Sequence, residues 1–297
     1  MREYIALGKK IYRIKYHKEL RRMLVFVLRC IRLRKEVDSL LDFFHADIRK
    51  EKIIEEVPCI IEQVTRSFFY NGSTPQERLK LIQEHFDFCL ANFSESAVNE
   101  MYINKKLIIW EGEYKEQPLT LDLHFDPGER KEGLLTLSLS LNKTMVYQIT
   151  FWFAENAKGE TVICLGALQG MNGGSKLIKG LTKHFHGYRT KNLILYALRV
   201  LAQSLGIKEI WAVSNEGFYA NNHLRLDRKL KTDLNAFWLE TGGEASADSR
   251  FYKLPVTEPR KSIEEVVSHK RSLYRKRFAA LDALAESLAV NLKSFLR

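Results

Sequence analysis

Polar side chains follow two apolar segments of the sequence that have the character of buried strands. Gln169 and Gly170 come directly after "TVICLGAL", and Asn215, Tyr219 and His223 come after "IKEIWAV". In open α/β sheets, ligands bind beyond the carboxyl ends of the strands, at the point where the topology changes. These five residues are therefore candidate site residues.

A phosphate site is predicted in "HGYRTK", which precedes a long apolar helix. Thr190 is a fair N-cap for that helix, so the amides at its start would point toward the crevice beyond the strands. The guanidinium of Arg189 is adjacent. Because amides and a guanidinium in one place can hold a phosphate, we assign Gly187, Arg189 and Lys191 to cofactor binding.

The glycines of "LGALQGMNGG" are a weaker phosphate candidate. Gly173 and Gly174 precede Ser175, the expected cap of a short helix, and neither G-x-x-x-x-G-K-[ST] nor G-x-G-x-x-G occurs. We interpret them as a turn and a helix entry. The sequence has no G-x-S-x-G, no H-E-x-x-H and no tight carboxylate pair. The pair His184 and His186 lacks a nearby acid or cysteine, so no metal site is predicted.

The net charge of +11 lies almost entirely in residues 1–35, which hold 12 Lys and Arg against two acids. Within this arm Leu20, Leu24, Val27 and Ile31 recur at helical spacing. A basic amphipathic helix could lie on an anionic membrane, at roughly 1 kcal/mol per basic residue. The alternative, which the pattern favours, is that the apolar stripe packs on the body. The near-neutral remainder makes nucleic acid an unlikely partner.

The elements that position these residues predict an α+β fold. Helices are expected over 51–69 and 74–93, the second opened by Thr74-Pro75 with Glu77. Alternating apolar residues then predict three antiparallel strands over 119–126, 134–141 and 145–153. The strand at 161–168, the helix at 192–206 and the strand at 207–215 form a βαβ unit, so the sheet is mixed.

A long C-terminal helix is expected from a capping box at Ser262 and Glu265, with a stripe that faces either the body or a partner. We divide the chain into a basic and helical region (1–97), an α/β core (98–258) and this helix (259–297). The four cysteines are far apart, which is typical of a reducing cytosol. No segment of the arm reaches the ~20 apolar residues that span a bilayer.

Several segments together resemble the VirK/YbjX family of Gram-negative bacteria. They are, in order, "LGALQG", "HGYRTKNLILYAL", "AVSN", "FWLETGGE", "FYKLP" and "SHKRSLYRKR". The resemblance implies a role in envelope integrity, virulence and resistance to cationic antimicrobial peptides, with no catalytic residues to carry over. The chain departs from the family pattern at Thr190, where Pro is usual, and at 233–235, where Asp-Tyr-Asp is usual.

The expected strand order is also similar to the GNAT acyltransferase fold, in which a helix N-terminus receives the pyrophosphate of acyl-CoA. The usual pyrophosphate signature is missing at the helix entry. The similarity implies an acyl or aminoacyl transferase acting on an envelope precursor at the inner membrane, from the cytoplasm, with acyl-CoA as the possible cofactor. Asn215, Tyr219 and His223 would then be catalytic. The alternative is a non-catalytic module that binds a membrane surface or a partner through residues 1–35.

Overall fold

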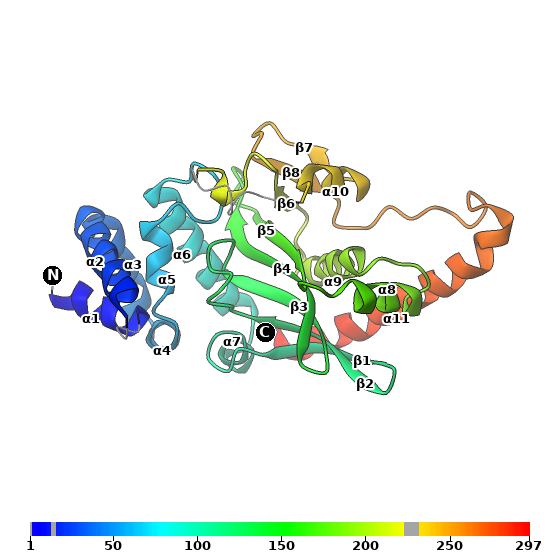
Figure 1. The fold of residues 1–297 in the computed structure, drawn as a ribbon, viewed down its shortest axis with the longest axis horizontal. Helices are drawn as coiled ribbons and strands as arrows, with labels where there is room; N and C mark the ends of the chain where they lie inside the picture. The colour runs from blue at the N-terminus through cyan, green and yellow to red at the C-terminus, as the bar shows by residue number, and fades with distance from the viewer. Residues whose placement is uncertain (1, 13–15, 223–231) are drawn as a thin grey trace.

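The fold has three layers, as Figure 1 shows. A computed structural model describes residues 2–12, 16–222 and 232–297. Helices of the N-terminal third cover one face of a central sheet, and helices from the second half of the chain cover the other. The predicted α+β class is therefore confirmed. The candidate residue His223 lies outside the described residues.

The N-terminal layer consists of short helices: α1 (Arg2–Ile11), α2 (His17–Arg32), α3 (Arg34–His45), α4 (Ile48–Glu56), α5 (Ile60–Thr65), α6 (Pro75–Asn92) and α7 (Glu95–Tyr102). The capping box of Thr74 and Glu77 at the start of α6 is confirmed. The single helix predicted over 51–69 is wrong. It divides at Pro58, because proline has no N–H for the helix ladder and displaces the preceding residue from helical geometry.

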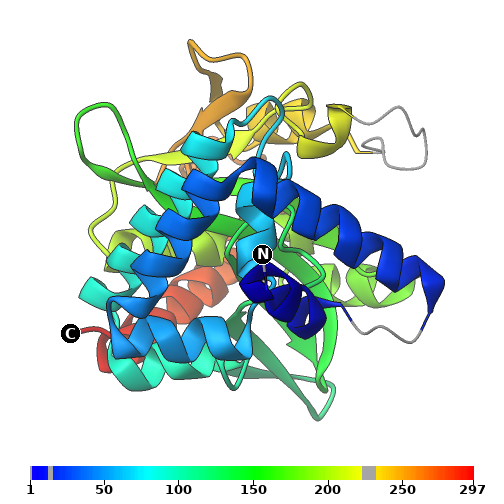
Figure 2. The same cartoon turned by 90° about the vertical axis from the view of Figure 1, so that its left-hand side faces the viewer.

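Helix α2 does not bury the apolar stripe that the sequence suggested. Its buried residues are Met23, Phe26, Val27 and Cys30, so Val27 is the one stripe member that packs inward. Leu20, Leu24 and Ile31 are 38%, 52% and 44% exposed. Figure 2 looks onto this layer from outside, with the N-terminal helices in front of the sheet. The helix therefore has two apolar faces, and one of them is exposed.

The sheet has eight strands among the described residues, in the order β1-β2-β3-β4-β5-β6-β8-β7. Their bounds are β1 (Leu107–Tyr114), β2 (Gln117–His124), β3 (Leu135–Leu141), β4 (Thr144–Glu155), β5 (Thr161–Gly170), β6 (Ile210–Val213), β7 (Glu244–Ala245) and β8 (Phe251–Leu254). Strands β1 to β5 form an antiparallel meander, and β6 is parallel to β5. The predicted meander and βαβ unit are thus confirmed, and β1 is an additional edge strand.

The crossover between β5 and β6 contains two helices, α8 (Ser175–His184) and α9 (Thr190–Ser204). Both predicted caps are wrong by one residue. Gly174 precedes α8 and Arg189 precedes α9, and neither start has a side-chain cap. Thr190 is instead the first helical residue of α9 and is buried at 1% exposure. Its hydroxyl donates to Ile178 O of α8 at 3.4 Å, so it joins the two helices.

The C-terminal part contributes helix α10 (Leu234–Glu240) and the long helix α11 (Arg271–Phe295). The Ser262–Glu265 box forms, but α11 begins nine residues after Ser262, so this box does not cap it. Helix α11 packs on α9 and β1, which settles that its stripe faces the body. Its end is joined to the α6–α7 junction by a bridge between Phe93 and Leu296.

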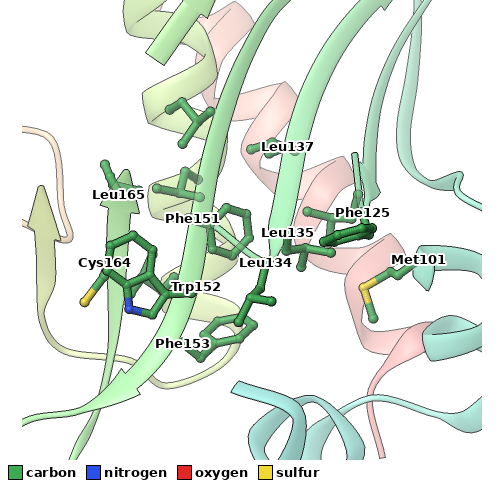
Figure 3. Close-up of a cluster of buried hydrophobic side chains, with 14 of the residues drawn as sticks. Met101, Phe125, Leu134, Leu135, Leu137, Phe151, Trp152, Phe153, Cys164 and Leu165 are labelled. Carbon is green, nitrogen blue, oxygen red and sulfur yellow. The ribbon is translucent and has the colours of Figure 1, made fainter. Parts of the chain in front are cut away.

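The core lies between the sheet and both helical layers. Figure 3 shows part of it, where Phe151, Trp152 and Phe153 of β4 lie beside Leu135 of β3 and Leu165 of β5. All five are at most 1% exposed. Consecutive β4 residues are buried because helices cover both faces, which is the pattern of a strand inside a three-layer fold.

Candidate functional site

A cavity of about 850 Å³ lies between α2, α5 and the end of β5, and we call it the basic cavity. Acids and aromatics also line it, including Glu62, Glu129, Glu132 and the predicted site residue Tyr219. Its basic lining residues are Lys18, Arg21, Arg22, Arg29, Arg66, Arg130 and Lys131. Such an excess of cations around a concave space attracts anions. The charge of the N-terminal arm is therefore partly turned toward this cavity.

Glu62 of α5 lines the basic cavity, and its side chain is fully buried. Tyr12 Oη donates to Glu62 Oε1 at 2.7 Å, and Arg66 Nη1 donates to the same oxygen at 2.7 Å. Arg130 donates to Oε2 through Nε at 2.9 Å and Nη2 at 2.7 Å. Burial alone would raise the pKa of Glu62, but these cations and hydrogen bonds outweigh it and leave the pKa below its usual value. This cluster joins α1, α5 and the β2–β3 connection.

Two carboxyl groups meet the predicted site residue Gln169 at the end of β5. Gln169 Nε2 donates to Glu129 Oε2 at 2.9 Å and to Glu132 Oε2 at 2.8 Å. Burial, then the neighbouring Glu129 charge, raises the pKa of Glu132 well above its ordinary value. A carboxyl with a raised pKa in a cavity is typical of an acid or base in catalysis. Sequence analysis did not predict this carboxylate pair, because the spacing of the loop residues does not show that both carboxyls converge on one amide.

A second cavity, of about 480 Å³, adjoins the first and shares Glu129 and Gln169 with it. We call it the polar cavity. It lies over the polar face of the meander and includes Asp122, His124, Ser138 and Gln148 in its lining. His124 Nδ1 lies 2.8 Å from Asp122 Oδ1. Alternation in "LTLDLHFD" had placed these two side chains on one face, which was the signal available for finding them.

Gly170, predicted to bind a cofactor, lines the polar cavity next to Tyr147 of β4, its partner in the sheet. A Cβ at position 170 would lie 2.7 Å from the Tyr147 ring. A side chain at position 170 would therefore displace this ring. Gln169 and Gly170 thus both line the polar cavity.

Arg189 and Lys191 converge on one carboxylate, that of Glu240 at the end of α10. Arg189 forms an ion pair with Glu240, and Lys191 Nζ lies 3.7 Å from Glu240 Oε2. Both bases also line a cavity of about 440 Å³ with Tyr147 and Ile178. Burial and the adjacent Arg189 charge lower the pKa of Lys191. The structure thus brings these two predicted residues together around an anion.

Gly187 serves the backbone rather than a cavity. Its φ of 79° is in the left-handed region that glycine favours, and its N–H donates to Thr182 O at 2.7 Å, which ends α8. Arg277 of α11 donates to His186 O through Nε at 3.0 Å and Nη2 at 2.9 Å. The turn is therefore fixed by α11.

Asn215 joins the end of β6 to the start of α10. Its Nδ2 donates to Asp233 Oδ1 at 2.8 Å, its Oδ1 accepts from Leu234 N at 2.7 Å, and its N–H donates to Asn235 Oδ1 at 2.8 Å. Asp233 is the N-cap of α10. Both amide atoms of the Asn215 side chain are thus engaged in structure.

Tyr219, in contrast, lines the basic cavity, 6.2 Å from the ring of Phe68 between centroids. Asn215 is not among the residues that line that cavity. Within the described ranges, no group of three or more His, Cys, Asp or Glu residues is placed to hold a metal ion. No described helix is long and apolar enough to cross a membrane.

Comparisons with known proteins identify relatives along most of the chain. A family model described as "Protein of unknown function (DUF535)" matches residues 15–290. The protein YbjX of Escherichia coli (strain K12) is 34% identical over 245 residues, which cover 80% of this chain and 73% of YbjX. A protein of Haemophilus influenzae is 25% identical over 259 residues, covering 85% of this chain and 84% of that protein. The chain therefore belongs to the DUF535 family, which confirms the resemblance to VirK/YbjX proteins.

Proposed function

We propose that this protein is a GNAT-like acyl or aminoacyl transferase that acts on an envelope precursor at the inner face of the cell envelope, from the cytoplasm. One observation carries the proposal. The end of β5, at Gln169 and Gly170, reaches the meeting point of a basic and a polar cavity. A transferase needs a centre that both donor and acceptor reach. An acceptor can occupy these two cavities, and Tyr147, which pairs with Gly170, also lines the third cavity, beside Arg189 and Lys191, where a donor would bind.

The arrangement of β5 and β6 supports the GNAT-like part of the proposal. The two strands pair only from Ile163 to Leu165 on β5, and β5 then continues to Gly170 without β6 beside it. The GNAT similarity was suggested by this arrangement: a meander that leads into a strand, then a crossover helix, then a second strand that parts from the first. In this proposal the donor reaches the sheet along the part of β5 that β6 does not cover.

The start of α9 is the proposed place for the donor's phosphates. Arg189 and Lys191 already bind one anion there, the carboxylate of Glu240, whose side chain is 44% exposed. A phosphate carries more charge than a carboxylate, and the helix N-terminus adds its own dipole. An incoming phosphate would therefore compete with Glu240 for the same two cations.

The test is a thermal-shift titration of the protein with CoA, acetyl-CoA and longer acyl-CoAs. A ligand at 100 times its Kd adds about 2.7 kcal/mol to the stability of the folded state. We expect a saturable shift in the wild type that is lost in the double variant Arg189→Ala/Lys191→Ala. The matched control is Lys176→Ala/Lys183→Ala, which removes two exposed charges from α8. No shift with any of these ligands would refute the use of acyl-CoA.

A second function, binding to an anionic membrane surface, is favoured by the exposed face of α2. Leu24 and Leu28 are 52% and 65% exposed there, in line with Leu20 and Ile31, and the basic residues of the helix flank them. Exposed apolar side chains beside cations are typical of helices that lie in a membrane interface.

Co-sedimentation with vesicles of phosphatidylglycerol and phosphatidylcholine tests this second function. We expect Leu24→Ser/Leu28→Ser to reduce pelleting with the anionic vesicles. The control is Leu239→Ser/Val290→Ser, which changes residues of similar exposure (58% and 60%) outside α2. Equal pelleting of both variants and the wild type would remove the support for a membrane role of this face.

A further inference from the structure

Four polar side chains cross the meander in one row on the face that lines the polar cavity. Asp122 of β2 is paired with Ser138 of β3, Ser138 with Gln148 of β4, and Gln148 with Gln169 of β5. We call these four residues the polar row. Three of them, Asp122, Ser138 and Gln148, are at most 4% exposed, and all four line the cavity. A row of donors and acceptors at strand spacing, ~4.8 Å, matches a ligand with several polar groups along its length.

Ser138 points to a ligand because its buried hydroxyl has no hydrogen-bond partner within the part of the chain that is described. A buried hydroxyl without a partner costs folding free energy, because it has lost its hydrogen bonds to water. The hydroxyl of Thr136, two residues before Ser138 on the same face of β3, is partnered with Thr150 Oγ1 at 3.3 Å. Thr120 Oγ1 of β2 is also buried without a partner, but Thr120 does not line the polar cavity, so of these hydroxyls Ser138 is the one that a bound molecule there would satisfy.

His124 lines the same cavity. Its Nδ1 faces the Asp122 carboxylate at 2.8 Å, and since a carboxylate accepts, Nδ1 carries the proton. In the neutral ring Nε2 is then an acceptor. A hydroxyl or an amine of a ligand in the polar cavity can donate to it.

The charges differ between the two adjoining cavities. The polar cavity has Asp122, Asp126 and Glu129 against Lys106 and Lys143, so it does not favour anions. The basic cavity, which meets it at Glu129 and Gln169, does. A molecule that extends across both would carry a negative group at one end and hydroxyls or an amine at the other.

We propose that the two cavities together bind a phosphorylated sugar or polyol, with its phosphate in the basic cavity and its hydroxyl or amine groups on the polar row and His124. The role of this ligand as the acceptor of the transfer rests on the proposed function. Its binding to the two cavities does not. A variant that no longer binds acyl-CoA should still bind the sugar phosphate, and a variant that no longer binds the sugar phosphate should still bind acyl-CoA.

The test uses glucosamine 6-phosphate, which has an amine, hydroxyls and a phosphate, in calorimetric titrations against the wild type and variants. We expect Ser138→Ala to weaken its binding roughly 2- to 10-fold, the range for one hydrogen bond, without lowering the melting temperature. Arg21→Ala should weaken the binding of both glucosamine 6-phosphate and inorganic phosphate. Ser138→Ala should leave inorganic phosphate binding unchanged.

The control is Thr136→Val, which removes a hydroxyl from the same strand and face but outside the cavity lining, and it should leave binding unchanged. A second arm distinguishes a free ligand from a lipid headgroup. It measures binding to phosphatidylglycerol vesicles, whose headgroup is a polyol phosphate, with and without glucosamine 6-phosphate as competitor. If only the vesicles bind, and Ser138→Ala weakens that binding, the ligand is lipid-linked. If Ser138→Ala changes neither binding, the proposal is wrong.

Discussion

Two carboxylates in this protein each accept two cationic side chains, and their surroundings differ. Glu62 is fully buried and binds Arg66 and Arg130, together with the hydroxyl of Tyr12. Its partners come from α1, α5 and the connection between β2 and β3. A buried, fully hydrogen-bonded ion pair of this kind fixes the position of the segments that contribute to it.

Glu240 is the second carboxylate, and its side chain is 44% exposed. Arg189 and Lys191 approach it from the start of α9, and water reaches all three groups. Exposed ion pairs contribute little to stability, about 0–1 kcal/mol. The comparison teaches that the same two-to-one arrangement joins segments of the fold where it is buried, whereas at Glu240 it leaves Arg189 and Lys191 open to solvent, as the proposed phosphate site requires.

The largest expected effect is that of Glu62→Gln. The variant leaves Arg66 and Arg130 partly buried without their counter-charge, and breaking a buried pair in this way costs about 3–5 kcal/mol. Urea unfolding followed by circular dichroism measures it. Glu240→Gln is the control, because it makes the same chemical change at the exposed pair. Equal losses of stability in the two variants would contradict the comparison.

An intermediate effect is expected in acid. Because the pKa of Glu62 is lowered in the folded protein, the folded state binds a proton less readily than the unfolded state. The stabilisation is fully present above the usual Glu pKa of about 4.3 and is lost as the pH falls through the lower, folded value. The difference in unfolding free energy between wild type and Glu62→Gln should therefore shrink below about pH 4. A difference independent of pH over that range would show that the ionised carboxylate is not what stabilises the cluster.

The smallest effect on stability, and the clearest on binding, is expected for Glu240→Gln. The unfolding free energy should change by less than about 1 kcal/mol. Pyrophosphate should bind several-fold more tightly, because Arg189 and Lys191 no longer hold a competing charge. Titration of pyrophosphate at low and moderate salt measures the affinity, and Glu244→Gln serves as a control at an exposed acid outside the cluster. An unchanged affinity would show that Glu240 does not compete for the site.

Local patterns predicted much of the sheet. Alternation defined β2, β3 and β4, and the change to strands apolar on both faces marked β5 and β6 as the parallel pair. Strand β1 was missed because "LIIWEGEY" is apolar only in its first half, as suits an edge strand. The stripe on α2 was predicted to pack on the body, but most of it is exposed. Periodicity shows which residues share a helix face but not which face packs on the protein.

The candidate site was predicted only in part, because its residues are distant in the sequence. The strand-end rule led to Gln169 and Tyr219, which both line the basic cavity. It could not show that Arg130 would reach across 68 residues to Glu62, or that Asn215 would be engaged by α10. Contacts of this kind depend on how whole layers pack, and no local spacing encodes them.

The attachment of α11 has a consequence for the order of folding. Ser94 N donates to Phe295 O at 2.8 Å, and Arg297 Nε donates to Phe93 O at 3.0 Å, so residues about 200 positions apart are joined. Contacts of such long sequence separation form slowly, because a large loop must close before they are made. During synthesis, the surface of β1 that α11 covers therefore stays exposed until α11 has left the ribosome.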